Sequence, residues 1–157
     1  MSKSRKRVEE ALRAAGLGAE IREMAGDCTT AEAAAATLGV AVDRIAKSVL
    51  LAGAQTGRMY LFLTAGTNAV DPEAAARCAG EALERPGAAR IRAETGFAIG
   101  GVAPLGHRCP VTAFQDPRLW DFATIWAAAG TPRHVFDAEP DALRAATGAT
   151  RATFTAP

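Results

Sequence analysis

Apolar residues recur along the chain at the spacings expected of helices and strands. Val8, Leu12 and Ala15 share one face of residues 4–15, and Gly16 interrupts the pattern. This spacing predicts an amphipathic helix near the N-terminus. Each further element of the sequence is predicted from the same periodicity together with its capping and turn residues.

Capping residues mark the starts of the helices near the middle of the chain. Thr29 followed by Glu32 is a capping-box pattern, which predicts the start of an alanine-rich helix that ends near 38–40. Asp71 before Pro72 is typical of an N-cap followed by the first helical residue. The same criteria predict helical turns at 42–46 and 116–122, the second capped by Asp116, and a last helix at 139–148.

Two apolar runs, 47–53 and 58–64, are rich in strand-forming residues. The four residues AQTG join them, and their length and glycine are typical of a hairpin loop. Further strand-like segments are predicted at 19–24, 109–116, 123–130 and 133–138. Helices do not strictly alternate with strands, as parallel βαβ units would require, so we expect an α+β fold with a mixed, mostly antiparallel sheet.

Composition and charge place the chain among ordered globular proteins. Its 157 residues are 49% hydrophobic and 22% charged, and no run of about 18 apolar residues indicates a membrane span. We expect one domain over residues 1–157, with the basic residues 1–7 as the start of a helix or a flexible tail. A net charge of +1 gives no long-range positive field, so a nucleic acid would have to be held locally.

Cysteine usage and the N-terminus favour a cytoplasmic protein. Cys28, Cys78 and Cys109 are odd in number and far apart, unlike a disulfide framework. The basic N-terminus lacks the apolar segment of a secretory signal. We therefore expect reduced thiols and a cytoplasmic location.

The segment TGFAIGGVAPLGH, residues 95–107, combines four glycines with a proline and a histidine. Its glycine spacing differs from that of dinucleotide-binding loops, and the chain has no P-loop sequence, so a nucleotide-phosphate site is not indicated. Two interpretations stay open from the spacing alone. The segment is either a tight turn, or a loop whose main-chain N–H groups between Gly100 and Ala103 hold a carbonyl or a developing oxyanion.

Few side chains offer conventional catalytic chemistry. Lys47 begins an apolar strand, where it either reaches solvent or binds a phosphate or carbonyl. His107 and His134 are general-base candidates or hydrogen-bonded surface residues, and with Cys109 they lack the paired spacing of a zinc site. The three serines lie outside any G-x-S-x-G motif, which argues against a serine nucleophile.

Three segments in the order TTAEAAAATLGVAVDRIAKSVLL, TGFAIGGVAPLGH and WAAAGTPRHVF give the chain a specific resemblance. It resembles the YbaK/ProX family, the free-standing relatives of the editing domain inserted in bacterial prolyl-tRNA synthetase. The resemblance implies a single compact α+β domain with a curved, barrel-like, mostly antiparallel mixed sheet flanked by helices. It also implies hydrolysis, in trans, of the ester between a wrong amino acid and the 3′ end of a tRNA.

The resemblance assigns roles to individual residues. Lys47 corresponds to the family's signature lysine, which implies binding of the substrate's 3′ end or its carbonyl side. Gly100 and Gly101 correspond to the loop whose backbone places the ester. The remaining substrate-binding assignments are Val102, Pro104, His107, Gly130, Thr131 and His134. Attack by water is expected to be assisted by the substrate itself.

The resemblance also implies partners and leaves the amino acid open. Aminoacyl-tRNA, with tRNA-Pro first, and an aminoacyl-tRNA synthetase are the expected partners; no metal, organic cofactor, membrane or DNA is expected. One methylene in an apolar pocket is worth about 1–3 kcal/mol, so a few side chains set the preference, and we expect a small amino acid such as alanine. The apolar residues suggested to size the pocket are Met24, Val49, Leu51, Phe97 and Ile99.

Two functions of other kinds stay open at this point. The chain could be a non-catalytic module that binds tRNA or a synthetase, or a hydrolase of an acyl ester that is not tRNA. The lysine of KSVLL and the intact GGVAP loop argue against the first, and the absence of a strong basic field leaves room for the second.

Overall fold

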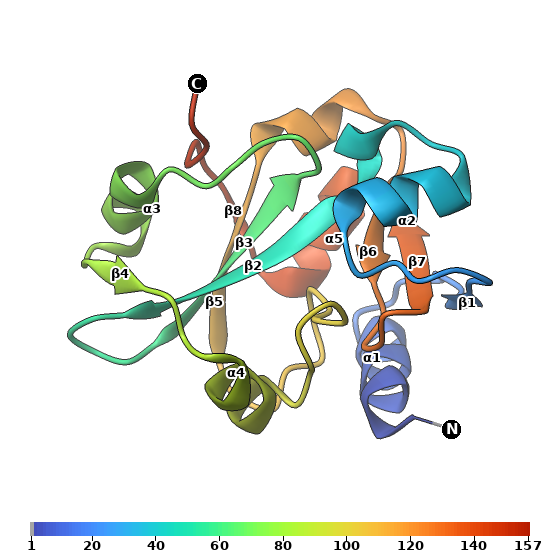
Figure 1. The fold of residues 1–157 in the computed structure, drawn as a ribbon, viewed down its shortest axis with the longest axis horizontal. Helices are drawn as coiled ribbons and strands as arrows, with labels where there is room; N and C mark the ends of the chain where they lie inside the picture. The colour runs from blue at the N-terminus through green and yellow to red at the C-terminus, as the bar shows by residue number, and fades with distance from the viewer. Residues whose placement is uncertain (1) are drawn as a thin grey trace.

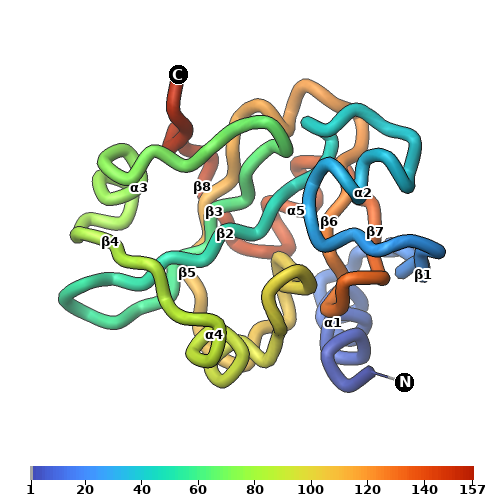
Figure 2. Tube along the Cα trace, viewed as in Figure 1, coloured from blue at the N-terminus to red at the C-terminus, as the bar shows by residue number. Residues whose placement is uncertain are grey.

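Two β-sheets and five α-helices make up the computed structural model, which describes residues 2–157 (Figures 1 and 2). The larger sheet contains, in spatial order, β4 (Leu83–Glu84), β2 (Ala46–Gly53), β3 (Met59–Ala65), β5 (Val111–Gln115) and β8 (Thr150–Arg151). The smaller sheet contains β1 (Arg22–Glu23), β7 (His134–Ala138) and β6 (Ile125–Ala128). The helices are α1 (Lys3–Ala14), α2 (Ala31–Leu38), α3 (Pro72–Ala79), α4 (Ala88–Thr95) and α5 (Pro140–Thr147), with single 3₁₀ turns at η1 (Val42–Arg44) and η2 (Pro117–Asp121).

The pairing of the strands confirms the expected α+β class and the mixed sheet. β2 and β3 form the predicted antiparallel hairpin, with Leu50 opposite Leu61. β3 then pairs in parallel with β5, and β5 in parallel with β8. The other pairs are antiparallel, and the two sheets do not close into a barrel.

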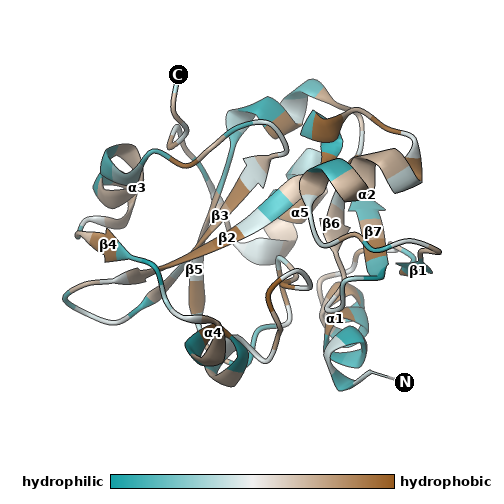
Figure 3. Ribbon diagram, in the orientation of Figure 1, coloured by the Kyte–Doolittle hydropathy of each residue, from teal (hydrophilic) through white to brown (hydrophobic). Residues whose placement is uncertain are grey.

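Burial on both faces explains why apolar residues follow one another through most of β3. Its Leu61 and Leu63 face the main core, while Phe62 faces the other side and packs against Phe114 and Phe154. A strand covered on both faces has no solvent-facing position, so its sequence does not alternate. Figure 3 shows hydrophobic colour along β5 and the later part of β2, and hydrophilic colour at the start of β2 and on parts of α1 and α4.

Several boundaries differ from those predicted from sequence. The segment predicted as a strand at 19–24 contains only the two-residue strand β1, and the two short strands β4 and β8 were not predicted. The helix α4 was also not predicted from sequence. Residues 3–7 belong to α1, which favours the predicted helix start over a flexible tail, while Met1 lies outside the described residues.

The N-cap of α2 is one residue later than the predicted capping box. Thr30 is the cap, and its hydroxyl accepts a hydrogen bond from the Ala33 N–H at 3.1 Å. The Thr29 hydroxyl instead donates to Asp27. The predicted pairing of Thr29 with Glu32 is therefore wrong, and the Glu32 carboxylate has no hydrogen-bond role in the cap.

The start of β2 lies where the two sheets separate. β4 pairs only with Ala52 and Gly53 of β2. Just before β2, Ile45 forms a single parallel bridge with Trp126 of the smaller sheet. Between these two points, within residues 2–157, one edge of β2 has no neighbouring strand, and this open edge positions the site described below.

Candidate functional site

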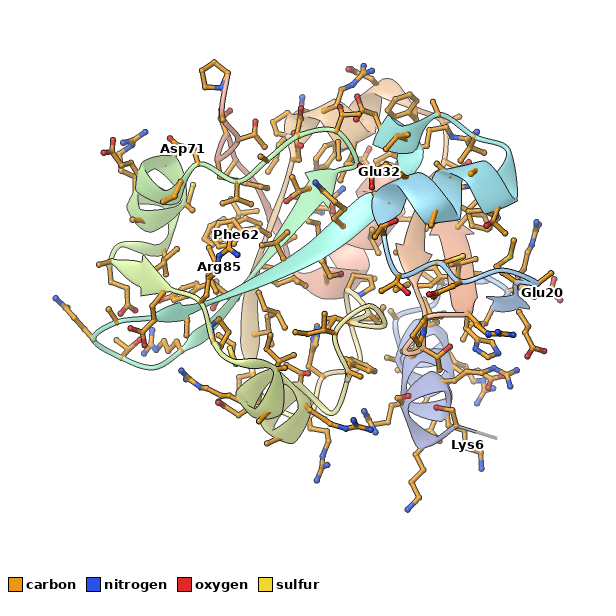
Figure 4. All side chains as sticks on the ribbon, in the orientation of Figure 1. Lys6, Glu20, Glu32, Phe62, Asp71 and Arg85 are labelled. Carbon is orange, nitrogen blue, oxygen red and sulfur yellow. The ribbon has the colours of Figure 1, made fainter. Side chains whose placement is uncertain are left out.

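A cavity of about 740 Å³ runs along the open edge of β2. Residues 46–51 of β2 form its floor, and the start of α2 and the segment 83–86 lie along its sides. Figure 4 shows Glu32 beside the start of β2 and Arg85 beside a later part of that strand. Two loops and the smaller sheet add further lining residues, which are Ile99, Gly100, Val102, Trp126, Ala127, Ala128, Thr131, His134 and Val135.

Lys47 places a positive charge on the wall of this cavity. In β2, Lys47 shares a face with Val49 and Leu51, because side chains alternate along a strand. Its Nζ donates a hydrogen bond to the main-chain carbonyl oxygen of Asn68 at 2.6 Å. Within residues 2–157 no carboxylate forms an ion pair with this ammonium group, so its remaining donors can serve a ligand.

The glycine loop meets two other segments at very short range. Gly100 has a φ of +91°, and a Cβ on it would lie 2.7 Å from Thr29 Cγ2. A Cβ on Gly101 would lie 2.8 Å from the Cα of Thr131. Glycine at both positions therefore allows the loop to pack directly against the start of α2 and the turn before β7.

The main-chain donors of the loop differ in their availability. The Gly101 N–H donates to the Ala98 carbonyl oxygen at 3.0 Å and closes a turn. The N–H groups of Gly100 and Val102 have no acceptor within residues 2–157, and both residues line the cavity. Gly101 does not line it. The loop's candidate donors are therefore Gly100 and Val102, while Gly101 supplies the close packing.

Thr131 and His134 line the side of the cavity formed by the smaller sheet. The Thr131 hydroxyl accepts a hydrogen bond from the Arg133 N–H at 3.2 Å and lies 2.6 Å from His134 Nδ1. Partial burial, helped by the charge of Arg5, lowers the pKa of His134 below its ordinary value, so the ring is neutral at pH 7.

Gly130 supports this wall from outside the cavity. Its φ is +95°, and a Cβ on it would lie 2.8 Å from the main-chain carbonyl of Ser4 in α1. The Ser4 hydroxyl donates to the Gly130 carbonyl oxygen at 2.7 Å. The residue predicted to line the pocket thus anchors α1 to the turn that carries Thr131.

The structure does not bring His107 or Pro104 to this cavity. Both line a separate hollow of about 210 Å³. His107 Nε2 donates to the Ala103 carbonyl oxygen at 2.8 Å, and its ring packs edge-on against Phe97 with centroids 5.6 Å apart. Burial lowers the pKa of His107. In this arrangement His107 helps to hold the shape of the loop, and contact of either residue with substrate stays a prediction.

The residues suggested to size the pocket divide in the same way. Val49, Leu51 and Ile99 line the cavity, and the Ile99 side chain is exposed. Phe97 is fully buried in the main core, and Met24 packs under α2 against the smaller sheet. Neither of these two lines the cavity.

Several polar residues of the cavity lining were not among the predicted site residues. They include Glu32, Ser48, Arg85 and Trp126. The Ser48 hydroxyl and the Trp126 indole N–H are buried without a hydrogen-bond partner within residues 2–157. The alternation along β2 assigns Ser48 to the face opposite Lys47, and nothing in the local sequence predicts that Arg85 or Trp126 lines the same cavity.

The cavity offers neither an activated side-chain nucleophile nor a metal site. Cys28 lines it, but burial and the nearby Asp27 raise the pKa of its thiol, which keeps it protonated at neutral pH. No cluster of three or more His, Cys, Asp or Glu side chains in the described part of the chain could hold a metal ion. Nor does any helix within residues 2–157 have the length and apolar character needed to cross a bilayer.

Comparison with known proteins explains this combination of a lysine, a glycine loop and a deep cavity. Residues 25–146 match the family described as the aminoacyl-tRNA editing domain. The chain belongs to this family. All the residues that line the cavity lie within the matched segment, and α1 precedes that segment.

The chain is also similar to two solved structures and to a protein of Bacillus subtilis. The editing domain superposes with a TM-score of 0.93 on a proposed trans-editing enzyme for prolyl-tRNA synthetase, with 40% identity over 100% of this chain and 99% of the other. A hypothetical protein, APE2540, gives a TM-score of 0.88 at 25% identity over 96% and 99% of the two chains. The uncharacterized protein YwhH of Bacillus subtilis (strain 168) is 28% identical over 124 residues, which are 79% of this chain and 78% of YwhH.

Proposed function

We propose that this editing domain is a free-standing deacylase that hydrolyses the ester between a small amino acid, alanine first, and the 3′ end of tRNA-Pro. One observation carries the proposal: the Lys47 ammonium, the Gly100 and Val102 amides and the neutral His134 ring surround a single cavity. The similarity to a proposed trans-editing enzyme for prolyl-tRNA synthetase supports the choice of tRNA.

The size of the cavity supports a substrate larger than an amino acid. Its volume of about 740 Å³ lies within the range of about 300–1,000 Å³ found for sites that enclose drug-sized ligands. An aminoacyl group and the terminal adenosine therefore fit together. Arg85, exposed on the rim and without an ion pair in the described residues, has the chemistry to stack on the adenine or to bind its phosphate.

The proposed reaction needs only water as a co-reactant. The water oxygen adds to the ester carbonyl carbon, and the carbonyl oxygen takes the negative charge. The N–H groups of Gly100 and Val102 stabilise this oxyanion, and the Lys47 ammonium holds the substrate's 3′ end beside it. When the intermediate collapses, the bond to the ribose oxygen breaks, and that oxygen leaves as a hydroxyl with the proton taken from water.

The proton acceptor in this proposal belongs to the substrate, as a ribose hydroxyl or the amino group of the amino acid. The proposal assigns no nucleophilic side chain, because such a side chain would need an adjacent base. The buried Ser48 hydroxyl has no partner within residues 2–157, and the Cys28 thiol is protonated.

The test is deacylation of tRNAs charged with alanine, cysteine, serine, threonine or proline. Wild-type protein is compared with Lys47→Ala and with Lys6→Ala, in which an exposed lysine of α1 is removed far from the cavity (Figure 4). We expect rapid clearance of tRNA charged with a small amino acid. Removal of Lys47 is expected to lower kcat/KM by about 100-fold, the scale of one lost transition-state donor, with no change for Lys6→Ala.

Either of two results would contradict the proposal and indicate a different function. Binding of tRNA without clearance of any charged species would indicate a non-catalytic binding module. Equal rates on alanine methyl ester and on alanyl-tRNA would indicate a hydrolase of small acyl esters, because such a substrate cannot use the outer part of the cavity.

A further inference from the structure

A buried carboxylate lies behind the lysine of the cavity. Asp116 follows β5 and is 2% exposed. Its Oδ1 accepts a hydrogen bond from the Arg118 N–H at 3.0 Å, which is the helix-cap role predicted from its position before a proline. Its other oxygen, Oδ2, accepts from the Ala65 N–H at 3.1 Å and from the Asn68 side-chain amide at 2.9 Å. Capping therefore accounts for only half of what this carboxylate binds.

The parallel pairing of β3 and β5 explains why these groups meet. The two strands run side by side with Leu63 opposite Gln115, so the residues that follow them emerge at the same end of the sheet. In Figure 1, β3 ends beside the start of β2, where the chain turns toward α3. Asp116 thus lies under the turn that connects β3 to α3, and Asn68 is part of that turn.

The turn is held at several points. The Asn68 N–H donates to the Ala65 carbonyl oxygen at 2.9 Å, and its side chain is bound to Asp116. The preceding Thr67 N–H donates to Asp43 at 2.8 Å. The direction of the Asn68 carbonyl is therefore fixed, and this carbonyl is the acceptor for Lys47 Nζ at 2.6 Å.

A lysine side chain on its own has four rotatable bonds and presents its charge in many positions. Catalysis depends on charge held in place before the reaction, because a misplacement of about 1 Å costs about 100-fold in rate. The contact with the Asn68 carbonyl restricts the ammonium of Lys47 to the cavity wall. The buried Asp116 fixes that carbonyl in turn.

We infer that Asn68 and Asp116 are positioning residues for Lys47 in the editing reaction, an inference that rests on the proposed function. Neither needs to touch the substrate. Asp116 orders the turn, Asn68 presents its carbonyl, and the carbonyl holds the ammonium where the 3′ end of the aminoacyl-tRNA binds.

The test uses two variants. Asn68→Ala keeps the main-chain carbonyl and removes the side-chain hydrogen bond to Asp116, and Asp116→Asn replaces one carboxylate oxygen, an acceptor, at constant side-chain size. Gln115→Met is the matched control, because Gln115 is fully buried and donates at 3.0 Å to the Pro140 carbonyl, away from the cavity. Single-turnover deacylation of alanyl-tRNA is measured in the wild-type and Lys47→Met backgrounds, with the melting temperature of each variant.

We expect Asn68→Ala and Asp116→Asn to lower kcat/KM about 10-fold or more in the wild-type background. In the Lys47→Met background they should lower it no further, because the group they position is gone. Gln115→Met should keep the wild-type kcat/KM. An equal fall in both backgrounds, or wild-type kcat/KM in the folded variants, overturns the inference.

A second readout does not depend on catalysis. The chain has only three lysines, Lys3, Lys6 and Lys47, so side-chain ammonium NMR signals are few enough to assign. A hydrogen-bonded Lys47 should exchange its ammonium protons more slowly than the two lysines of α1, and Asn68→Ala should remove this protection. If the Lys47 ammonium protons are not protected in the wild type, or are equally protected in Asn68→Ala, the inference is contradicted, whether or not any charged tRNA is cleared. If Asn68→Ala removes this protection but the wild type clears no charged tRNA, only the proposed function is contradicted.

Discussion

Gly101→Ala tests whether the loop's close packing shapes the site. The new methyl carbon would lie 2.8 Å from the Thr131 Cα, compared with an optimal carbon–carbon separation of about 3.5–4.0 Å. Both atoms belong to regions held by the main chain, so no flexible side chain can move aside. The loop and the turn before β7 must therefore separate by up to about 1 Å.

Two consequences follow from that displacement. Forcing a methyl group into a packed region costs about 1–3 kcal/mol of stability, and each kcal/mol lowers the melting temperature of a domain of this size by about 2–4 °C. The displacement also moves the Gly100 and Val102 amides relative to Lys47. A shift of about 1 Å costs about 100-fold in rate, so kcat/KM for alanyl-tRNA should fall by about that factor.

The assay pairs thermal unfolding with deacylation kinetics. Gly18→Ala is the matched control, because it makes the same chemical change where no atom lies within 4 Å of the new Cβ and the backbone has no positive φ. It should keep wild-type kcat/KM. If Gly101→Ala is destabilised yet fully active, the contact is structural and does not place the donors; if neither property changes, the packing argument itself is wrong.

Three further outcomes follow from individual charged residues. Hydrogen bonds, chiefly from Thr56 and Tyr60, lower the pKa of Glu81 to about 2. The stability that the ionised carboxylate adds to the folded protein is therefore present above pH 4.5 and is lost as the pH falls toward 2. The difference in melting temperature between wild type and Glu81→Gln should shrink over that range. Because the charge of Arg5 helps to lower the pKa of His134, Arg5→Gln should raise that pKa in an NMR titration. Arg85→Gln should lower kcat/KM for alanyl-tRNA several-fold and leave hydrolysis of alanine methyl ester unchanged, since the small ester does not reach the rim; an equal loss on both substrates would contradict this assignment.

Local signals in the sequence predicted the elements that depend on local physics. Asp71 and Pro72 begin α3 as expected, and the Asp71 carboxylate accepts from the Ala74 N–H at 3.3 Å. The β2–β3 hairpin follows from two apolar runs and a glycine-containing loop. These features need only neighbouring residues, so spacing and side-chain type are sufficient to find them.

The candidate site depends on contacts that spacing cannot predict. Lys47 was identified in the sequence, but its acceptor, Asn68, is 21 residues away and is fixed by a residue that follows a different strand. His107 ends the predicted loop, yet its ring turns inward because the Ala103 carbonyl and Phe97 are available there. The side of the loop that faces the cavity is decided by the packing of Gly101 on Thr131, which no local pattern encodes.

In the proposed mechanism, different groups of this cavity serve the reaction and the choice of amino acid. The proposed oxyanion donors are main-chain groups, and they bind the ester of every amino acid alike. Discrimination must then come from the walls, including Val49 and Leu51, at about 1–3 kcal/mol per methylene. A site of this kind depends on backbone geometry more than on side-chain identity. The protein APE2540, at 25% identity, still superposes with a TM-score of 0.88, so the backbone that carries the proposed main-chain donors is retained although most side chains differ.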